Sequence, residues 1–274
     1  MMNARIGLCF LLLLGACGEA PDQGWLGYAE GDSAMISAPQ PGWVTEMKVE
    51  RGQVVRRGDL LFVLDSTQQQ ASRDQAQASL AQARASLQQE QANLAYARTE
   101  LGRQNKLASA GAGTPTQRDL AQNNARQSAA RIAQLQAQIG QTQASLSGAA
   151  YGLSQRQIVA QTSGPVQDIY FRPGEYVPAS TPVVSILPPA NIYARFFVPQ
   201  SQMARLRLGQ KVRITCDGCK AMTATVTFIA SQVEFTPPVI FSTDNREKLV
   251  FKLEARNPAG LDLHPGQPVT VRPL

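Results

Sequence analysis

The strongest constraint on the fold is an internal repeat that is split by a long insertion. The segment ISAPQPGWVTEMKVERGQVVRRGDLLFVLD (Ile36–Asp65) aligns without a gap with IVAQTSGPVQDIYFRPGEYVPASTPVVSIL (Ile158–Leu187), each residue lying 122 positions after its counterpart. Turn glycines and alternating apolar residues recur at matching places, so each copy is expected to form about three or four short strands. Neither copy can close a core alone, so together they are expected to make one small β-sandwich.

Residues 66–157, between the two copies, have the pattern of two long helices. Apolar residues recur every seven positions, with smaller or apolar partners three positions away. They are Leu80, Leu87, Leu94 and Leu101 with Ala76, Ala83 and Ala97, and then Ile132, Ile139, Leu146 and Leu153 with Leu135 and Ala149. This seam predicts an antiparallel coiled-coil hairpin. A hairpin with no binding partner would show the same stripe.

A glycine-rich break divides the insertion. In ASAGAGTPT (Ala108–Thr116), Pro115 is placed as a first-turn residue of the returning helix and Thr114 as its N-cap. The tip of the hairpin is therefore expected at about residues 103–119. Each arm would have about 40 residues and reach roughly 60 Å.

Each copy of the repeat resembles half of a biotinyl/lipoyl domain, in residues 36–65 and 158–188. The resemblance lies in a glycine, a valine two residues on, and then GQVVRRGDLL or GEYVPASTPV. In carriers of that family the halves join through a tight hairpin that bears the modified lysine. Here the junction holds the helical insertion, and no lysine lies between Lys48 and Lys106. A prosthetic-group carrier is therefore the weaker alternative, and no cofactor is expected.

The amino terminus resembles a bacterial lipoprotein signal. Arg5 precedes the apolar run Ile6–Leu14, which leads into LGAC, Leu14–Cys17. The run is too short to span a bilayer, which takes about 20 helical residues. The resemblance implies a signal peptide over residues 1–16 and lipidation of Cys17, which would anchor the chain to a membrane. A plain signal cleaved nearby is the alternative. Residues 17–35 are expected to be a linker.

The last part of the chain, residues 189–274, again consists of short alternating strands and is expected to be a β-barrel domain. Cys216 and Cys219 flank Asp217-Gly218, a strong hairpin-turn pair. In an oxidising compartment a local disulfide across the turn is favoured over free thiols. The single histidine, His264, lies in an LHPGQP turn.

No catalytic arrangement is visible. One histidine leaves no Ser/His/Asp or Cys/His set and no metal site, and no phosphate-binding glycine motif occurs. The net charge of +6 is modest, and no basic cluster is interleaved with aromatic residues. Neither an enzyme nor a nucleic-acid-binding protein is expected.

In their order, these segments resemble the HlyD-type periplasmic adaptors, also called membrane fusion proteins, over almost the whole chain from Cys17. The resemblance implies an elongated, multidomain α+β protein in the periplasm of a Gram-negative bacterium. It implies a link between an inner-membrane transporter and a TolC-type outer-membrane channel for export of drugs, toxic compounds or other substrates. It also implies a homo-oligomer, most plausibly a hexamer. A coiled-coil envelope protein without a transport role is a further alternative.

The resemblance also bears on the transporter class. Adaptors that serve RND pumps usually add a membrane-proximal domain built from both termini, and only a short segment precedes the first lipoyl half here. An ABC transporter is therefore favoured over an RND pump, with a major-facilitator pump in between. An anchor in the inner membrane is favoured with it, whereas Gly18 after Cys17 does not match the enterobacterial pattern for retention there, so sorting to the outer membrane is the alternative.

Adaptors that dock on TolC-type channels carry an arginine, a leucine four residues later and a serine seven after that, followed by an acidic residue. This sequence has Arg103, Leu107, Thr114 and Asp119 at that spacing, with threonine in place of serine. The resemblance implies that these residues contact the channel. Without it, Arg103 reads as a solvated helix residue and Leu107 as a last seam contact.

Overall fold

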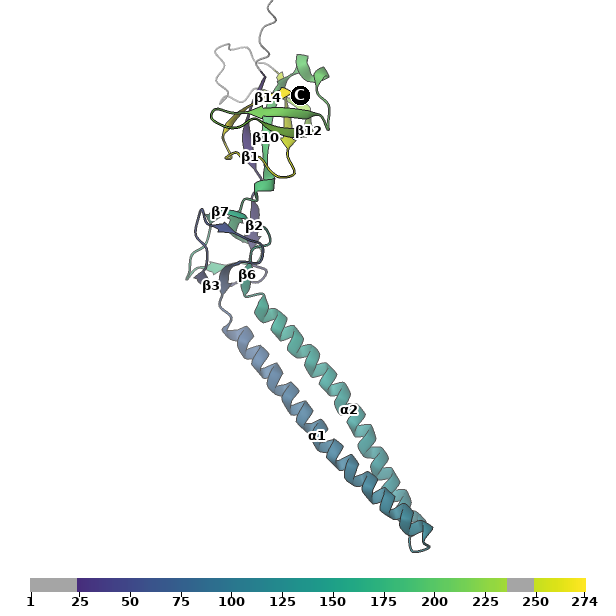
Figure 1. Ribbon diagram of the computed structural model, residues 1–274. Helices are drawn as coiled ribbons and strands as arrows, with labels where there is room; N and C mark the ends of the chain where they lie inside the picture. Colours follow the sequence, from purple (N-terminus) through teal and green to yellow (C-terminus); the bar gives the residue numbers. More distant parts are fainter. Residues whose placement is uncertain (1–23, 236–248) are drawn as a thin grey trace, which may run out of the picture. The chain divides into compact units, whose positions relative to one another are not determined.

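The computed structural model describes residues 24–235 and 249–274 (Figure 1). They fall into two compact units, each with its own apolar core. One unit combines the described residues up to Asp32 with Pro189–Leu274, and the other runs from Ser33 to Pro188. The chain therefore starts in the first unit, builds the whole second unit, and returns to complete the first.

The unit from Ser33 to Pro188 contains two four-stranded sheets, with strand orders β2-β9-β7-β4 and β6-β5-β3-β8. The strands are β2 (Ala34–Ser37), β3 (Gly42–Met47), β4 (Val54–Val55), β5 (Leu60–Leu64), β6 (Gln157–Val159), β7 (Gly164–Ile169), β8 (Tyr176–Val177) and β9 (Pro182–Ile186). Each sheet takes its two central strands from one copy of the repeat and its two outer strands from the other. Neither copy can therefore complete a sheet by itself.

The strand registers repeat at the same offset as the sequence. Val44 pairs with Leu64 in one sheet, and Val166 pairs with Ile186 in the other, and both ladders are irregular at the next step. The outer strands obey the same rule, because the pair Ile36–Val184 corresponds to the pair Ile158–Phe62. The two sheets are thus related by a pseudo-two-fold axis, and their inward residues form one core.

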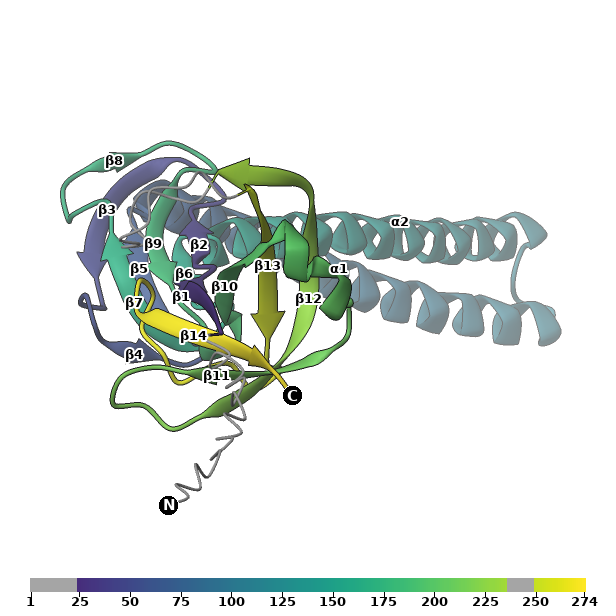
Figure 2. The same cartoon turned by 90° about the horizontal axis from the view of Figure 1, so that it is seen from above.

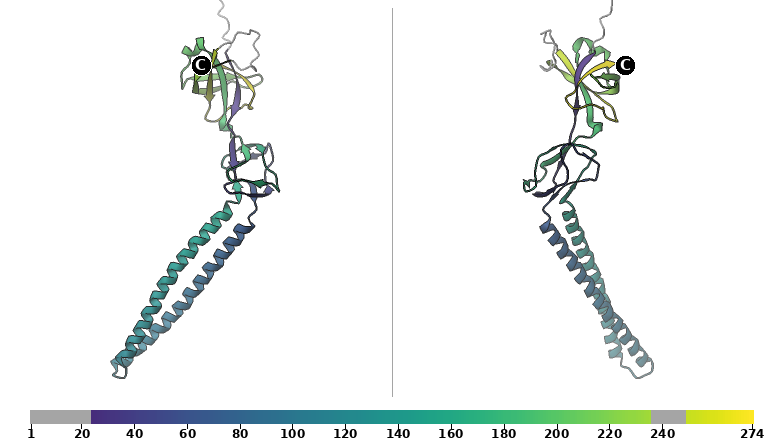
Figure 3. Two further views of the ribbon diagram at one scale, coloured as in Figure 1. Left: turned by 180° about the vertical axis from the view of Figure 1, so that it is seen from behind. Right: turned by 60° about the vertical axis from the view of Figure 1, so that its left-hand side comes forward.

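Two long helices replace the tight turn between the halves. Helix α1 (Thr67–Ser109) has 43 residues and α2 (Pro115–Ser154) has 40. Both views of Figure 3 show them running side by side away from the strands. Every seam position named from the sequence is buried or half-buried, with Leu80, Ala83 and Leu94 the most buried on α1. The predicted helical hairpin is confirmed.

The root of the hairpin is held by neighbouring strands. Strand β5 leads into α1, β6 follows α2, and Val63 of β5 pairs with Gln157 of β6. Arg156, only 8% exposed, donates from Nη1 to the Pro41 carbonyl oxygen at 2.8 Å, and its own carbonyl accepts from the Leu64 amide at 2.8 Å. The two ends of the helical insertion are therefore tied to the sandwich and to each other.

The start of α1 is capped by the residue before its N-cap. Oδ1 of Asp65 accepts hydrogen bonds from Oγ1 of Thr67 at 2.7 Å and from the Thr67 amide at 3.1 Å. These bonds, with the nearby positive charge of Arg156, lower the pKa of the Asp65 carboxyl below its usual value. The ionised carboxylate thus satisfies an amide that the helix leaves free.

The other unit contains six strands that pair in a closed ring, in the order β1-β10-β13-β12-β11-β14. The strands and short 3-10 helices are β1 (Trp25–Gly31), η1 (Pro189–Asn191), β10 (Ile192–Pro199), η2 (Gln200–Arg205), β11 (Lys211–Thr215), β12 (Met222–Phe235), β13 (Leu249–Arg256) and β14 (Pro268–Pro273). Fully buried side chains such as Phe196, Ile214 and Leu253 fill the interior.

The expected linker over residues 17–35 needs correction. Its described part contains β1, which pairs with β10 and β14 and closes the ring, and β2 begins at Ala34. Trp25 packs against Phe196 in the core, and its indole donates to Oε1 of Gln202 at 2.6 Å. Gly27 leaves no room for a side chain, because a Cβ there would lie 2.2 Å from the Arg195 carbonyl oxygen. The barrel therefore needs this amino-terminal segment.

Candidate docking site at the hairpin tip

Helix α1 ends at the tip in a glycine-terminated turn. The Ala112 amide donates to the Leu107 carbonyl at 2.9 Å, and the Gly111 amide donates to the Ala108 carbonyl at 3.1 Å. This is the Schellman pattern, in which the residue after the helix adopts a left-handed conformation. Gly111 has φ +74° and meets that need without strain. The tip is therefore a turn with a defined backbone conformation.

Thr114 starts the returning helix. Its Oγ1 accepts from the Gln117 amide at 3.3 Å, and Pro115 occupies the first helical turn. The predicted N-cap is confirmed. Because a hydroxyl can accept and donate at once, capping leaves the O–H of this exposed residue able to donate to a partner. Its structural role and a docking role are therefore compatible.

Arg103 and Leu107 lie one turn apart on α1. The Arg103 side chain is 65% exposed and its Nη1 lies 3.2 Å from Oε2 of Glu100. Glu100 also accepts from Nε2 of Gln104 at 2.8 Å. Leu107 is 39% exposed, which is high for a residue of the seam. A cation and an apolar side chain are thus presented together, with the cation oriented by a neighbouring carboxylate.

Asp119 lies near the start of α2 and pairs with its neighbour, since Oδ1 is 3.0 Å from Nη2 of Arg118. Leu120, the next residue, is 61% exposed. Leu120 belongs to no motif in the sequence, although its position in the second turn of α2 and outside the seam indicates exposure. The tip therefore exposes a leucine on each helix.

The four residues chosen from the sequence all lie in or beside the tip, and all four are exposed. Arg103 and Leu107 share one helix, while Thr114 and Asp119 belong to the start of the other. Within the described residues, no hydrogen bond or ion pair joins the first two to the last two. They are four exposed residues on the two helix ends, and they do not form one connected network.

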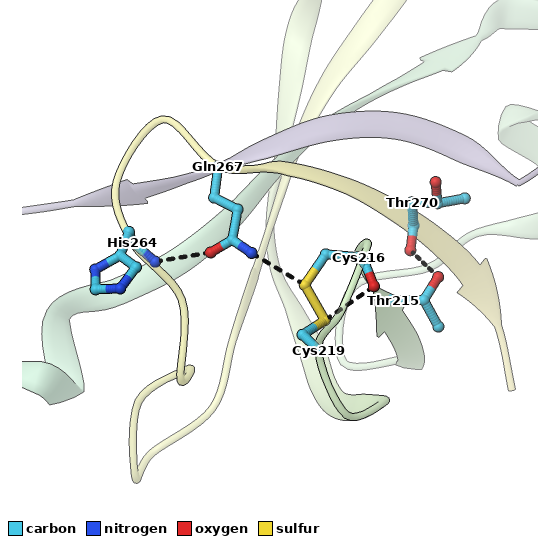
Figure 4. Close-up of a disulfide and its surroundings, with 6 residues drawn as sticks. All are labelled: Thr215, Cys216, Cys219, His264, Gln267 and Thr270. Carbon is cyan, nitrogen blue, oxygen red and sulfur yellow. Dashed lines mark hydrogen bonds between the residues drawn. A yellow bond between two sulfur atoms is a disulfide. The ribbon is translucent and has the colours of Figure 1, made fainter.

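Cys216 and Cys219 form a disulfide in the connection between β11 and β12 (Figure 4). The Cys219 amide donates to the Cys216 carbonyl at 3.3 Å across Asp217-Gly218. Regular pairing ends at Ile214 and Met222, so this turn belongs to a connection longer than two residues.

The neighbouring turn braces the disulfide. Nε2 of Gln267 donates to Sγ of Cys216 at 3.3 Å, and its Oε1 accepts from the His264 amide at 3.1 Å. Figure 4 shows Thr215 and Thr270 tied next to it, where the hydroxyl of Thr215 donates to the Thr270 carbonyl at 3.2 Å. His264 is a turn residue here, held through its backbone.

The most perturbed titratable groups lie on the barrel and neutralise one another. Arg195 lies against Glu30 and pairs with Glu254 at 2.9 Å, while the Arg256 guanidinium lies 3.8 Å from the centre of the Tyr193 ring. Burial, together with the negative charge of Glu254, raises the pKa of Tyr193 to about 12. Such paired networks stabilise strands and do not by themselves indicate catalysis.

Two searches of the described ranges, 24–235 and 249–274, bear on other functions. No group of three or more His, Cys, Asp or Glu side chains is placed to hold a metal ion there. No helix in those ranges is both long and apolar enough to cross a membrane. The predicted lipidation site, Cys17, and the predicted signal peptide lie outside the described residues.

The fold has clear counterparts among solved structures. MacA from Actinobacillus actinomycetemcomitans superposes with a TM-score of 0.68 at 20% identity, covering 90% of this chain and 76% of MacA. The membrane fusion protein Spr0693 from Streptococcus pneumoniae gives 0.58 at 18% identity, with 90% and 97% covered. The periplasmic adaptor protein EmrA gives 0.52 at 13%, with 93% and 100% covered. The chain has the fold of the periplasmic adaptors. The resemblance to HlyD-type adaptors, or membrane fusion proteins, is thereby confirmed at the level of the fold.

Comparisons of sequence find relatives over part of the chain. No family model matches. A UPF0194 membrane protein of Acidithiobacillus ferridurans is 33% identical over 144 residues, which is 51% of this chain and 42% of that protein. The uncharacterised protein YdhJ of Escherichia coli is 26% identical over 194 residues, 69% of this chain and 61% of YdhJ. The chain thus spans about half the length of the curated relatives that it matches.

Proposed function

We propose that this chain is a periplasmic adaptor of a tripartite export system. It would link an inner-membrane transporter to a TolC-type outer-membrane channel for export of drugs, toxic compounds or other substrates. One observation carries the proposal: the turn that joins the two halves of the sandwich has become a helical hairpin of 43 and 40 residues. A carrier needs a short modified turn at this place, whereas a link between membranes needs reach.

The hairpin supports the proposal through its length and its tip. Helices of this size extend about 60 Å at 1.5 Å per residue. The tip is a defined turn that exposes Arg103, Leu107 and Leu120. Arginine can donate several hydrogen bonds to carbonyl or carboxylate groups of a channel mouth, and exposed leucines can pack against it. The transporter would supply the energy and the adaptor the path.

The partners and the location follow as parts of the same proposal. An ABC permease and ATPase are the favoured transporter, and a homo-oligomer, favoured as a hexamer, would enclose the path because one hairpin cannot. Lipidation of Cys17 would hold the chain at the inner membrane of a Gram-negative bacterium, with the described residues in the periplasm. The disulfide between Cys216 and Cys219 agrees with an oxidising compartment.

The test places a photo-cross-linking residue at the tip. We would substitute benzoylphenylalanine for Leu120, irradiate intact cells, and identify the adducts by mass spectrometry. The matched control carries the same residue at Tyr151, which is 67% exposed but lies near the end of α2 at the root. If the chain is an adaptor, the residue at position 120 in the tip gives an adduct with an outer-membrane channel, and the residue at position 151 in the root gives none.

Charge reversal at the tip completes the test. Arg103→Glu should abolish the channel adduct and export while circular dichroism of the helices stays unchanged, because Arg103 is 65% exposed. Unchanged export and unchanged cross-linking would refute the docking assignment. The intact mass of the mature chain separates the carrier alternative, which requires biotin or lipoate on a lysine. Purification that recovers neither transporter nor channel would favour an envelope protein without transport.

A further inference from the structure

Two apolar patches are exposed on the sandwich at positions that its pseudo-two-fold axis exchanges. The aromatic patch is Trp43 on β3 with Tyr176 on β8, 56% and 50% exposed, and their ring centres are 5.4 Å apart in an edge-to-face pair. The aliphatic patch is Val54 on β4, 72% exposed, with the half-buried Pro165 on β7. Trp43 pairs with Tyr176, and Pro165 pairs with Val54, in matching registers. The sandwich thus carries two equivalent edges with unlike side chains.

The two patches point away from each other. Strands β8 and β4 are the outer strands of different sheets. Figure 2 shows them on opposite sides of the sandwich. A molecule that is bound through one patch therefore keeps the other patch free for a second contact.

The surroundings of the patches are complementary. The turn after Val54 carries Arg56 and Arg57, both exposed, and neither forms an ion pair within the described residues. The equivalent turn beside Tyr176 runs Pro178-Ala179-Ser180-Thr181 and carries no charge. An arginine gains most from an aromatic face when both lose water, and arginine, tryptophan and tyrosine dominate the centres of interfaces. The basic edge therefore fits the aromatic edge of another copy.

We infer that these edges are the two sides of one head-to-tail interface between copies of this chain. Trp43 and Tyr176 of one copy pack against Val54 and Pro165 of the next, with Arg56 and Arg57 over the aromatic rings. The inference rests on the proposed function, in which several copies surround a path. Contacts between unlike patches leave a free patch at each end, and they close into a ring when the rotation between copies allows it.

The first experiment uses cysteine pairs and a short bis-maleimide on the full chain. The Trp43→Cys chain and the Val54→Cys chain are each treated with the cross-linker alone. In a parallel sample the two chains are mixed before the cross-linker is added. If the two edges meet, covalent dimers form only in the mixture. A chain that carries both substitutions then gives a ladder of larger species. A cross-link from either single variant alone indicates contact between like patches and overturns the inference, as does a mixture without dimers.

The second experiment measures association by sedimentation velocity. The double variant R56E/R57E should weaken self-association at least about tenfold, because it replaces the cations that face the aromatic rings. The matched control is Arg207→Glu, at the first position of a turn of the same pattern in the barrel, which should associate as the wild type does. Wild-type affinity in the double variant overturns the interface.

The two proposals fail separately. A chain that still yields the channel adduct from residue 120, yet associates independently of Trp43 and Arg56, refutes this interface and keeps the adaptor function. A chain that gives the expected dimers but no channel adduct refutes the adaptor function and keeps the interface. A wild-type chain that stays monomeric in both experiments overturns the interface.

Discussion

At the scale of single residues, one turn design recurs through both units. In five turns the third residue is a glycine with φ between +83° and +95°, and the side chain of the fourth residue accepts from the amide of the first. The turns start at Glu50, Arg56, Arg172, Arg207 and His264. The fourth residue is always Gln, Asp or Glu, because the bond needs a side-chain oxygen. Each turn thereby satisfies the amide of its first residue internally, while the glycine amide donates to a carbonyl of another segment.

The sixth turn, Pro178–Thr181, shows why the pattern changes where it does. Proline at the first position has no amide to satisfy, so the fourth residue can be a threonine without an acceptor role. Ser180 takes the place of glycine and is the only residue other than glycine with positive φ, +61°, among the described residues. A side chain in the left-handed region costs about 1 kcal/mol. The sandwich therefore carries a small local strain at this turn.

We expect Ser180→Gly to relieve that strain. The gain should be up to about 1 kcal/mol in the free energy of unfolding, reduced by the greater freedom of glycine in the unfolded chain. The symmetric counterpart, Gly58→Ala, should cost about 1 kcal/mol, and no atom lies within 4 Å of an added Cβ, so steric overlap does not contribute. Urea unfolding followed by circular dichroism of the helices measures both. Destabilisation by Ser180→Gly would contradict the account.

A second expectation concerns Asp65, whose pKa is lowered mainly by the hydrogen bonds from Thr67. A carboxyl with a lowered pKa in the folded state adds stability above its unfolded pKa of about 4, and this contribution is lost as the pH falls through the folded value. Asp65→Asn should therefore destabilise the protein at neutral pH and match the wild type in acid. Unfolding midpoints across that pH range test it. If the difference in unfolding midpoint between Asp65→Asn and the wild type does not change with pH, the charge of Asp65 does not contribute to stability.

At the scale of elements, the interlaced sheets explain how a long insertion is tolerated. Because each sheet needs strands from both copies, the two halves of the repeat must come together whatever length of chain separates them. Loop closure grows only slowly in cost with length, and the helices pair with each other along the seam. The insertion is therefore an addition to a complete sandwich, and it is tied to the sandwich at its root.

Arg156 is one of the contacts at this root, and its removal should be costly. Arg156→Met keeps much of the volume but removes the buried guanidinium that donates to the Pro41 carbonyl at 2.8 Å. We expect a loss of about 2–3 kcal/mol in the free energy of unfolding, since the bond involves a charged group. The control Arg126→Met, on the exposed surface of α2, should change it by less than about 0.5 kcal/mol. If Arg156→Met and Arg126→Met change the free energy of unfolding equally, Arg156 does not anchor the root of the hairpin.

Several of these elements could be predicted from the sequence because their causes are local or periodic. The offset of the repeat correctly indicated which strands correspond, the seven-residue spacing identified the buried faces of both helices, and Thr114 and Pro115 marked the start of α2. Each of these signals depends on residues close in the chain or on a regular repeat. Such features do not require knowledge of distant partners.

Other features could not be predicted because their causes are distant in the chain. Strand β1 is stabilised by β10 and β14, more than 150 residues away, and its glycines, Gly27 inside the strand and Gly31 at its end, disguise the strand pattern. Arg156 follows a helix like any polar residue, and only the fold brings the Pro41 carbonyl to it.

At the scale of the whole molecule, the two proposals together make export depend on every copy in an assembly. If identical copies join head to tail, each contributes one hairpin tip to the contact with the channel. A copy with a defective tip and intact edges on its sandwich would still enter the ring. The tip and the interface lie in separate parts of the chain, so each can be changed alone.

Mixing experiments exploit that separation. Cells that produce Arg103→Glu chains and wild-type chains in equal amounts should lose nearly all export, since only about one ring of six in 64 would contain no variant. Export should therefore fall more steeply than the wild-type fraction as the ratio is varied. The rate of export measured against the ratio of the two chains, as determined by mass spectrometry, tests this. A linear dependence would indicate that copies act singly.

A control tests whether the variant lowers export by entering rings with wild-type copies. It combines the tip change and the edge changes in one chain. A variant that carries Arg103→Glu together with Arg56→Glu and Arg57→Glu keeps the defective tip but should no longer enter rings with the wild type. Wild-type export should therefore return to the level set by the wild-type copies alone, because the defective tips are excluded from assemblies. If the triple variant lowers wild-type export as much as Arg103→Glu alone does, copies join through surfaces other than the Trp43 and Val54 edges.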